Sequence, residues 1–121
     1  MSFARFDVVI VPFPFTDRPV TRRRPALVVS NAEWNAASGH VVAAMITSAR
    51  QSAWPHDVLV TDRAAAGLTA PCVVRMKLFT LEAGLVIRRA GTLARDDAAA
   101  VEAALAAVLS AAGLAPRPAQ R

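Results

Sequence analysis

The sequence of 121 residues is poor in the residues that bind metals and form disulfides, since it contains one cysteine and two histidines. Cys72 alone can form neither an internal disulfide nor the thiolate cluster of a structural zinc site. His40 and His56 lie far apart and lack the spacing of metal ligands. We therefore expect no metal centre and no cofactor, with Cys72 as a small apolar core residue.

Long uninterrupted apolar runs are also scarce. Asp7 precedes the first such run, and Pro12 and Pro14 interrupt it before it could form the core of a secretory signal. The alanine-rich stretch 98–115 is long enough to raise the question of a membrane span. However, alanine is weakly apolar and acidic residues lie at or inside this stretch. These features predict a soluble, cytoplasmic protein.

Lysine is nearly absent, because thirteen of the 14 basic residues are arginine. Residues 94–121 carry equal numbers of basic and acidic side chains, so the net charge of +5 lies entirely within residues 1–93. The planar guanidinium suits phosphate better than the point charge of an ammonium group, which indicates a polyanionic partner. The alternative is that arginine simply replaces lysine throughout an alanine- and arginine-rich proteome.

Short β-rich runs separated by turn residues occupy most of the chain. The length suits one domain of about 100–150 residues, and we expect it to cover residues 1–115. The pattern predicts a mainly β, α+β fold built on a small barrel or sandwich. Single helical turns are expected within 31–38 and 63–66. The expected strands are 6–11, 25–30, 40–47, 57–60, 72–76 and 85–87, the last of which could continue towards Gly91.

The C-terminal part changes from strand-like to helical character. Apolar side chains recur on one helical face, at Val101, Leu105, Val108, Leu109 and Ala112. Acidic residues at the start and the Gly113–Pro116 region at the end fit the two termini of a helix. We expect a helix over about 95–112 that packs on the barrel, followed by a flexible tail over 116–121.

Three adjacent arginines, Arg22, Arg23 and Arg24, stand where an exposed connection meets an apolar strand. Pro25 pushes Arg24 towards extended backbone geometry, so the base of that side chain is well placed. Such an arrangement suits an anion site. The alternative is a solvated, charged loop that protects a sheet edge from aggregation.

Two hydroxyl residues, Thr47 and Ser48, end the third expected strand. Hydroxyls at strand ends can bind phosphate, but they often satisfy only local backbone groups. Phe13, Phe15 and Trp54 offer rings that could stack on bases. Packing in the core is an equal alternative for Phe13.

Taken in order, these segments resemble the MazF/PemK family of toxin endoribonucleases, in its PemK-like branch. The resemblance runs from about residue 6 to 110. The early connection 16–22 departs from many members, because it has neither their glycines nor their glutamate. The similar segments are 7–16 (DVVIVPFPFT), 23–30 (RRPALVVS), 46–48 (ITS), 67–68 (GL), 72–81 (CVVRMKLFTL) and 89–93 (RAGTL).

The resemblance implies an SH3-like small barrel of the CcdB/MazF/PemK type with a C-terminal helix, in a homodimer. It also implies cleavage of single-stranded RNA at short motifs without a metal, and a cognate antitoxin protein that blocks the groove. By motif, Arg24 and Thr47 would be the catalytic residues. The residues expected to bind RNA are Phe15, Thr16, Arg22, Arg23, Ser48 and Gln51.

The chemistry of these residue types fits that implication. Arg24 can neutralise charge on a phosphorane, and Thr47 can orient a phosphate or a hydroxyl. Arginine stays protonated near neutral pH, so neither residue supplies a general base. Two alternatives stay open: a CcdB-like toxin that poisons DNA gyrase by binding alone, and a catalytically silent relative that binds RNA or an antitoxin.

Overall fold

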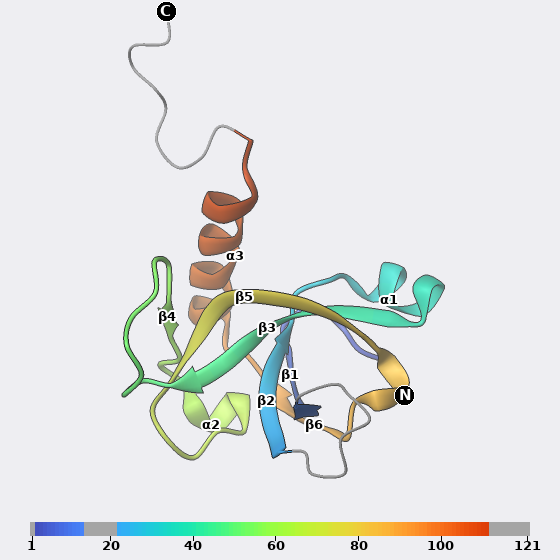
Figure 1. Ribbon diagram of the computed structural model, residues 1–121, viewed down its shortest axis with the longest axis horizontal. Coiled ribbons are helices and arrows are strands. Elements are labelled where there is room, and N and C mark those ends of the chain that lie inside the picture. The colour runs from blue at the N-terminus through green and yellow to red at the C-terminus, as the bar shows by residue number, and fades with distance from the viewer. Residues whose placement is uncertain (1, 14–21, 112–121) are drawn as a thin grey trace, which may run out of the picture.

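The computed structural model describes residues 2–13 and 22–111 (Figure 1), and all statements on the structure refer to them. They form six strands, three α-helices and one 3-10 helix. In chain order the elements are β1 (Asp7–Phe13), β2 (Arg22–Val28), α1 (Ala32–Ser38), β3 (His40–Ser48), β4 (Val58–Leu59), α2 (Arg63–Ala66), β5 (Cys72–Glu82), η1 (Ala83–Leu85), β6 (Arg88–Thr92) and α3 (Arg95–Leu109).

The strands form one antiparallel sheet in the order β4-β5-β3-β2-β1-β6. The long strands β3 and β5 curve across the molecule in Figure 1, so the sheet curls into a half-barrel. Helix α3 stands at the end of the sheet where β4 lies, and α1 lies at the other end (Figure 1). The predicted mainly β fold with a C-terminal helix is confirmed.

Alternating apolar side chains give the sheet a separate core on each face. One core includes Val8, Leu27 and Ile46, and α3 covers it with Val101 and Leu105. The second core lies on the other face of the same strands and consists of Phe3, Val9, Val11, Ala26, Val28, Val41, Ala43, Leu81 and Val86. Both faces are therefore apolar at their centres, which explains why the strand sequences lack a clean polar alternation.

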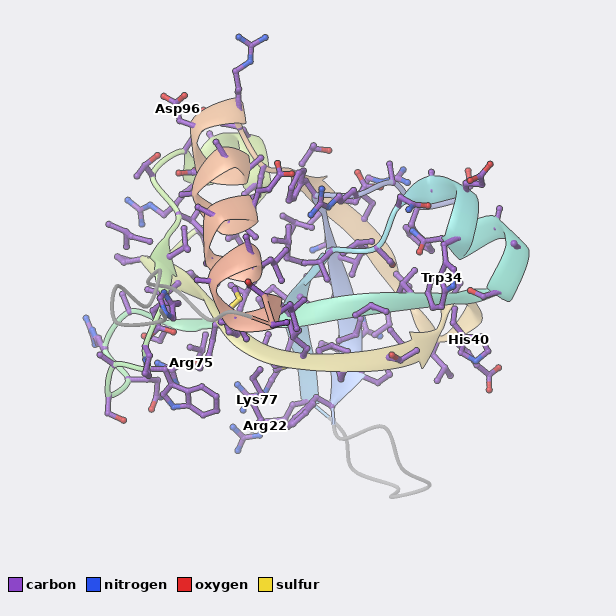
Figure 2. All side chains as sticks on the ribbon, turned by 90° about the horizontal axis from the view of Figure 1, so that it is seen from above. Arg22, Trp34, His40, Arg75, Lys77 and Asp96 are labelled. Carbon is purple, nitrogen blue, oxygen red and sulfur yellow. The ribbon has the colours of Figure 1, made fainter. Side chains whose placement is uncertain are left out.

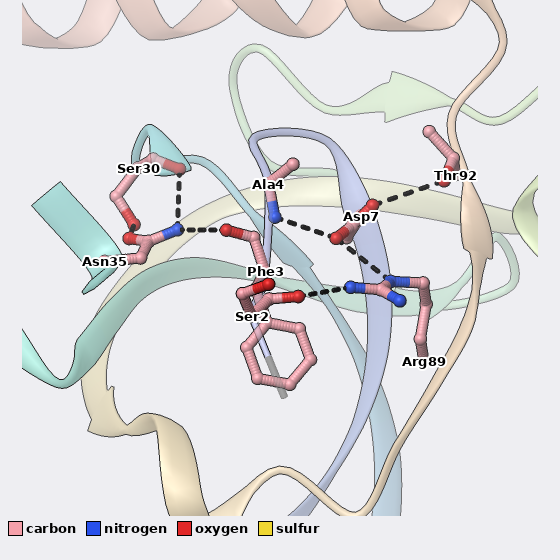
Figure 3. A network of polar contacts seen from close by, with 8 residues as sticks. All are labelled: Ser2, Phe3, Ala4, Asp7, Ser30, Asn35, Arg89 and Thr92. Carbon is pink, nitrogen blue, oxygen red and sulfur yellow. Dashed lines mark hydrogen bonds and ion pairs between the residues drawn. The ribbon is translucent and has the colours of Figure 1, made fainter. Parts of the chain in front are cut away.

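A buried carboxylate fixes the N-terminal segment to the sheet (Figure 3). Asp7 Oδ2 accepts hydrogen bonds from Ala4 N at 2.8 Å and from Arg89 Nε at 3.0 Å. Its other oxygen, Oδ1, accepts one from the Thr92 hydroxyl at 3.2 Å. Arg89 also donates to the Ser2 carbonyl at 2.6 Å. The charge of Asp7 is thus paired at the β1–β6 edge, and Phe3 is held in the second core.

Glycine is required where α2 approaches β6. Gly67 ends α2 with φ +73°, and a Cβ there would lie 2.1 Å from the Ala90 carbonyl oxygen. Gly91 meets α2 from the opposite direction, because its Cβ would lie 2.4 Å from the Ala65 carbonyl oxygen. The two glycines let the backbones of α2 and β6 touch.

Strand β2 begins at Arg22, three residues earlier than expected, so the three arginines belong to the strand rather than to the loop before it. Strand β1 likewise continues through Pro12 to Phe13. A proline is tolerated there because β6 pairs with β1 only as far as Ile10. Beyond that point β2 is the single neighbour of β1 among the described residues, so the missing N–H of Pro12 faces no described strand.

The last expected strand, over 85–87 with a continuation towards Gly91, is placed too early, because β6 covers Arg88–Thr92. The first residue of the expected strand belongs to η1, which closes with a hydrogen bond from Val86 N to the Ala83 carbonyl at 3.1 Å, and the strand β6 follows at Arg88. Val86 is buried, whereas Leu85 and Ile87 are exposed. The apolar run therefore marks one anchoring side chain in a turn, not a strand.

The expectation for the C-terminal helix is correct at its start and too long at its end. Helix α3 ends at Leu109, where Ser110 adopts an extended backbone (φ −70°, ψ 135°). Val101 and Leu105 are buried, but Val108 and Leu109 are 43% and 66% exposed, so the apolar stripe outruns the sheet that it covers. The helical stop at Gly113–Pro116 and the tail 116–121 lie outside the described residues. Within the described ranges, no helix combines the length and apolarity that a membrane span requires.

Candidate active site

A pocket of about 180 Å³ opens beside the second core. It gathers residues from β1, β2, β3, β5 and the connection between β3 and β4. Its lining residues are Phe13, Arg24, Met45, Ile46, Thr47, Trp54, Arg75 and Lys77. The lining described by the structure is cationic and aromatic, and it holds no carboxylate.

The two sequence-predicted catalytic residues lie in this pocket. Strands β2 and β3 pair in a constant register that includes Ala26 opposite Met45. Continuing that register by two residues places Arg24 opposite Thr47, and both side chains fall on the face of the second core. Residues 23 positions apart in the sequence therefore become cross-strand neighbours.

Arg24 carries an unsatisfied donor. Its side chain is half-buried, and its Nε is buried with no hydrogen-bond partner among the described residues. The guanidinium carbon lies 5.8 Å from the centre of the Phe13 ring. A buried N–H without an acceptor is costly, whereas an anionic oxygen at that position would form a strong charge-assisted bond. The geometry therefore fits an oxyanion against Arg24.

Arg75 is positively charged but already paired. Its Nε and Nη2 donate to the two carboxylate oxygens of Asp57 at 3.1 and 2.9 Å, and Nη2 also donates to the Ser52 carbonyl at 2.6 Å. The hydrogen bonds from Arg75 lower the pKa of Asp57 below its ordinary value, more than burial raises it, and the Trp54 N–H adds to the lowering. Arg75 is thus a structural cation in the wall of the pocket.

Lys77, the only lysine in the sequence, extends from an irregularity in β5. The register of β3 with β5 shifts between Ala44, which pairs with Leu78, and Met45, which pairs with Arg75. Two residues of β5 consequently face no partner, and such bulges redirect side chains near binding sites. Lys77 and Arg22 extend from the same side of the molecule in Figure 2. Lys77 forms no ion pair within residues 2–13 and 22–111.

The other predicted RNA-binding residues are more scattered. Arg22 and Arg23 are exposed on β2, where alternation puts Arg22 on the face of Arg24 and Arg23 on the opposite face. Ser48 lies instead in a separate pocket with Arg50, and its hydroxyl accepts from the Arg50 N–H at 3.2 Å. Gln51 is exposed and outside the lining of the Arg24 pocket. Phe15 and Thr16 lie outside the described residues.

The sequence alone did not identify Arg75 and Lys77, and it left Trp54 undecided. The partner of Arg75 is 18 residues away, and no local pattern indicates the pair. The bulge that exposes Lys77 depends on the pairing of β5 with β3 and has no signature in β5 itself. The one available signal was that Lys77 is a single lysine in an arginine-rich chain.

Cys72 takes the apolar role predicted for it, at the edge of the first core. Its Sγ donates to the Ala70 carbonyl at 3.2 Å. Burial raises the pKa of the thiol, and the positive charge of Arg63 offsets this only in part. A raised thiol pKa disfavours the thiolate needed by a nucleophile. Within the described residues, no three histidine, cysteine or acidic side chains lie together as a metal-binding group.

Solved structures with the same fold include toxins and toxin complexes. A MazE–MazF complex from Deinococcus radiodurans has 23% identity and a TM-score of 0.73, with 90% of this chain and 97% of that chain covered. A mycobacterial endoribonuclease in complex with its cognate antitoxin has 20% identity and a TM-score of 0.69, with 95% and 98% covered. The Mycobacterium tuberculosis toxin MazF-mt6 has 22% identity and a TM-score of 0.67, with 83% and 92% covered.

Comparison with curated protein sequences gives no match. A family model does match, over residues 4–109, and it describes the PemK-like, MazF-like toxins of type II toxin–antitoxin systems. This range contains every described residue of the Arg24–Thr47 pocket. The chain therefore belongs to the PemK-like, MazF-like family of toxins of type II toxin–antitoxin systems.

Proposed function

We propose that this toxin is a metal-independent, sequence-specific endoribonuclease that cleaves single-stranded RNA in the cytoplasm and so inhibits translation and growth. The observation that carries the proposal is the buried Nε of Arg24, which has no hydrogen-bond partner among the described residues and lies in one pocket with Thr47. A buried cationic donor of this kind fits a phosphate of the RNA backbone.

The proposed reaction uses the RNA's own 2′-hydroxyl as nucleophile. The 2′-oxygen forms a bond to the adjacent phosphorus, and the bond from phosphorus to the 5′-oxygen of the next nucleotide breaks. The proton lost from the 2′-hydroxyl is balanced by the proton gained at the 5′-oxygen. The products are a 2′,3′-cyclic phosphate and a 5′-hydroxyl end.

Each pocket residue has a role that its chemistry allows. Arg24 donates to a non-bridging phosphate oxygen, where negative charge increases in the transition state. Thr47 provides one donor and two acceptor sites and orients the phosphate or the 2′-hydroxyl. Lys77 adds a second positive charge at the pocket and forms no ion pair in the described part of the chain, whereas the charge of Arg75 is paired with Asp57. Catalysis in this account is positioning and electrostatic stabilisation.

We further propose a cognate antitoxin and a homodimer as the protein's assemblies. Two structural neighbours are toxins solved with an antitoxin, MazE in one of them, which supports an antitoxin partner here. The cationic pocket lined by Arg24, Arg75 and Lys77 favours a partner segment with acidic residues, because complementary charge accelerates and orients association.

The test is incubation of the purified protein with a long mixed-sequence RNA in EDTA, followed by mapping of both fragment ends. The proposal predicts cuts at a short recurring motif, with 5′-hydroxyl and cyclic-phosphate ends. A parallel assay of DNA gyrase supercoiling serves as the control for toxicity by binding. Intact RNA would contradict the proposal, whether or not the protein inhibits supercoiling by gyrase.

A further inference from the structure

The connection between β3 and β4 brings an exposed tryptophan to the rim of the Arg24–Thr47 pocket. Trp54 lines this pocket and is nevertheless 41% exposed. An indole ring gains free energy by burial, so an exposed ring held in a fixed place is unusual in a surface loop. The contacts of the surrounding residues show how it is held.

Three hydrogen bonds donated by Arg75 of β5 hold this connection, and a fourth lies within it. Asp57 binds the Arg75 guanidinium with both carboxylate oxygens, and it also accepts a hydrogen bond from the backbone N–H of Trp54 at 2.9 Å. Arg75 donates to the Ser52 carbonyl at 2.6 Å. Between the two anchors, His56 adopts a left-handed backbone with φ 65°, a conformation that non-glycine residues rarely take. The loop is therefore fixed at residues 52, 54 and 57.

The ring of Trp54 itself is also fixed. The Arg75 guanidinium carbon lies 5.0 Å from the ring centre, a cation–π contact on one face of the indole. The exposed fraction of the side chain leaves ring surface open to a ligand. An aromatic ring stacked against a nucleic-acid base contributes a large, sequence-tolerant part of single-strand binding.

We propose that Trp54 is a specificity-determining residue that stacks on the base next to the phosphate held by Arg24 and Thr47. Arg75 and Asp57 are positioning residues, because they touch the ring and its loop rather than the RNA. This inference rests on the proposed function and names one subsite of the same pocket.

The second tryptophan of the chain is a matched control. Trp34, on α1, is 42% exposed, and it lies at the end of the molecule opposite Arg75 (Figure 2). The backbone N–H of Trp34 donates to the side-chain oxygen of Asn31, the N-cap residue of α1, at 2.8 Å. The two tryptophans are thus almost equally exposed, but of the two it is Trp54 that lines the pocket.

Because the sequence contains two tryptophans, single substitutions yield one-tryptophan proteins. Trp34→Phe retains the fluorescence of Trp54 alone, and Trp54→Phe retains that of Trp34 alone. The probes are a non-cleavable mixed-sequence 2′-O-methyl RNA oligonucleotide and an abasic ribose-phosphate oligomer of equal length and charge. We expect the base-bearing probe to quench Trp54 and not Trp34, and the abasic probe to quench neither.

Steady-state cleavage of RNA supplies the second readout. Trp54→Ala is expected to raise KM by about 5- to 100-fold, with a smaller change in kcat and a broader set of cut sites. Trp54→Phe should restore most of KM, and Trp34→Ala should leave both parameters unchanged. Asp57→Asn should also raise KM, as Trp54→Ala does. In the Trp34→Phe background, it should increase the quenching of Trp54 fluorescence by acrylamide.

The inference is overturned if the wild-type protein cuts RNA and Trp54→Ala leaves KM and the cut sites unchanged. It is equally overturned if the base-bearing probe binds without quenching Trp54. If RNA is not cut but the base-bearing probe still quenches Trp54, the stacking subsite stands and the proposed cleavage falls. The two proposals can therefore fail separately.

Discussion

The guanidinium of Arg75 binds both carboxylate oxygens of Asp57, with Nε 3.1 Å from Oδ1 and Nη2 2.9 Å from Oδ2. Their side chains are only 10% and 13% exposed. This pair joins the β3–β4 connection to β5, and it removes one positive charge from the pocket. The cations left without an acidic partner there are Arg24 and Lys77, within the described part of the chain.

Removing one member of this pair should cost far more than removing both. Asp57→Leu leaves the Arg75 charge buried and unpaired, and we expect a loss of about 3–5 kcal/mol in the free energy of unfolding. The double variant Asp57→Leu/Arg75→Met replaces the pair with apolar side chains and should recover most of that loss. Urea denaturation of the three proteins measures both values. A double variant no more stable than the single one would contradict the account.

Asp97 is a further buried carboxylate with a definite role. Its oxygens accept from the Thr61 N–H and hydroxyl and from the Asp62 N–H, at 2.7 to 3.1 Å. Burial raises the pKa of Asp97, but these hydrogen bonds outweigh it, and the pKa lies below its ordinary value of 3.8. The stabilisation is thus present above that value and is lost as pH falls through the lower pKa of the folded state.

Asp97→Asn should therefore lower the free energy of unfolding at pH 7 by about 1.5–3 kcal/mol, and the difference should shrink below pH 4. The matched control is Asp96→Asn, an exposed carboxylate at the same helix start, with an expected cost of about 0.3–1 kcal/mol. Denaturant titrations at three pH values decide between them. Equal costs for the two variants would show that the stabilising effect of Asp97 comes from the helix dipole and not from its hydrogen bonds to Thr61 and Asp62.

Two glycines with left-handed backbone allow the cost of backbone strain to be separated from the cost of a steric clash. Gly39 and Gly67 have φ +72° and +73°, but a Cβ at Gly39 meets nothing within 4 Å, whereas at Gly67 it meets the Ala90 carbonyl oxygen. We expect Gly39→Ala to cost about 1–2 kcal/mol and Gly67→Ala to cost about 1–3 kcal/mol more. Thermal or urea unfolding tests the difference, and costs within error of each other would refute the close approach of α2 and β6.

The salt dependence of single-stranded RNA binding should reflect the number of basic side chains that contact phosphates. For single strands, the slope of log K against log salt falls by about 0.7 for each phosphate contact. Lys77→Gln should reduce the magnitude of the slope by about that amount. Arg95→Gln, exposed at the start of α3 on the other face of the sheet, should leave it unchanged. Fluorescence anisotropy with a non-cleavable oligonucleotide measures both slopes, and equal slopes for Lys77→Gln and wild type would remove Lys77 from the binding surface.

The sequence predicts those features that depend on local pattern. The apolar part of β2, the strand β3, the helical turn before Gly39 and the start of α3 follow from short-range signals that the structure confirms. Prediction from the sequence fails where pairing between distant segments determines where a strand begins. Strand β2 includes Arg22 because Phe13 pairs with it, and the apolar run at residues 85–87 becomes a turn because the ladder of β6 with β1 begins only at Arg88.

The site divides in the same way. Arg24 and Thr47 are recognisable because each sits in a short motif at a strand end. The ion pair of Arg75 with Asp57 joins segments 18 residues apart, and the direction of Lys77 comes from a bulge opposite β3. Neither leaves a mark in the neighbouring sequence, so only the folded sheet reveals them.

If Arg24 and Thr47 together stabilise the transition state of RNA cleavage, each is needed at any single cleavage site, and single-turnover rates on one mapped site measure this. Arg24→Ala and Thr47→Ala should each reduce the rate by about 100-fold or more. Their matched controls, Arg95→Ala on α3 and Thr80→Ala on β5, should keep the wild-type rate. Cleavage that survives both pocket substitutions in folded protein would contradict the account.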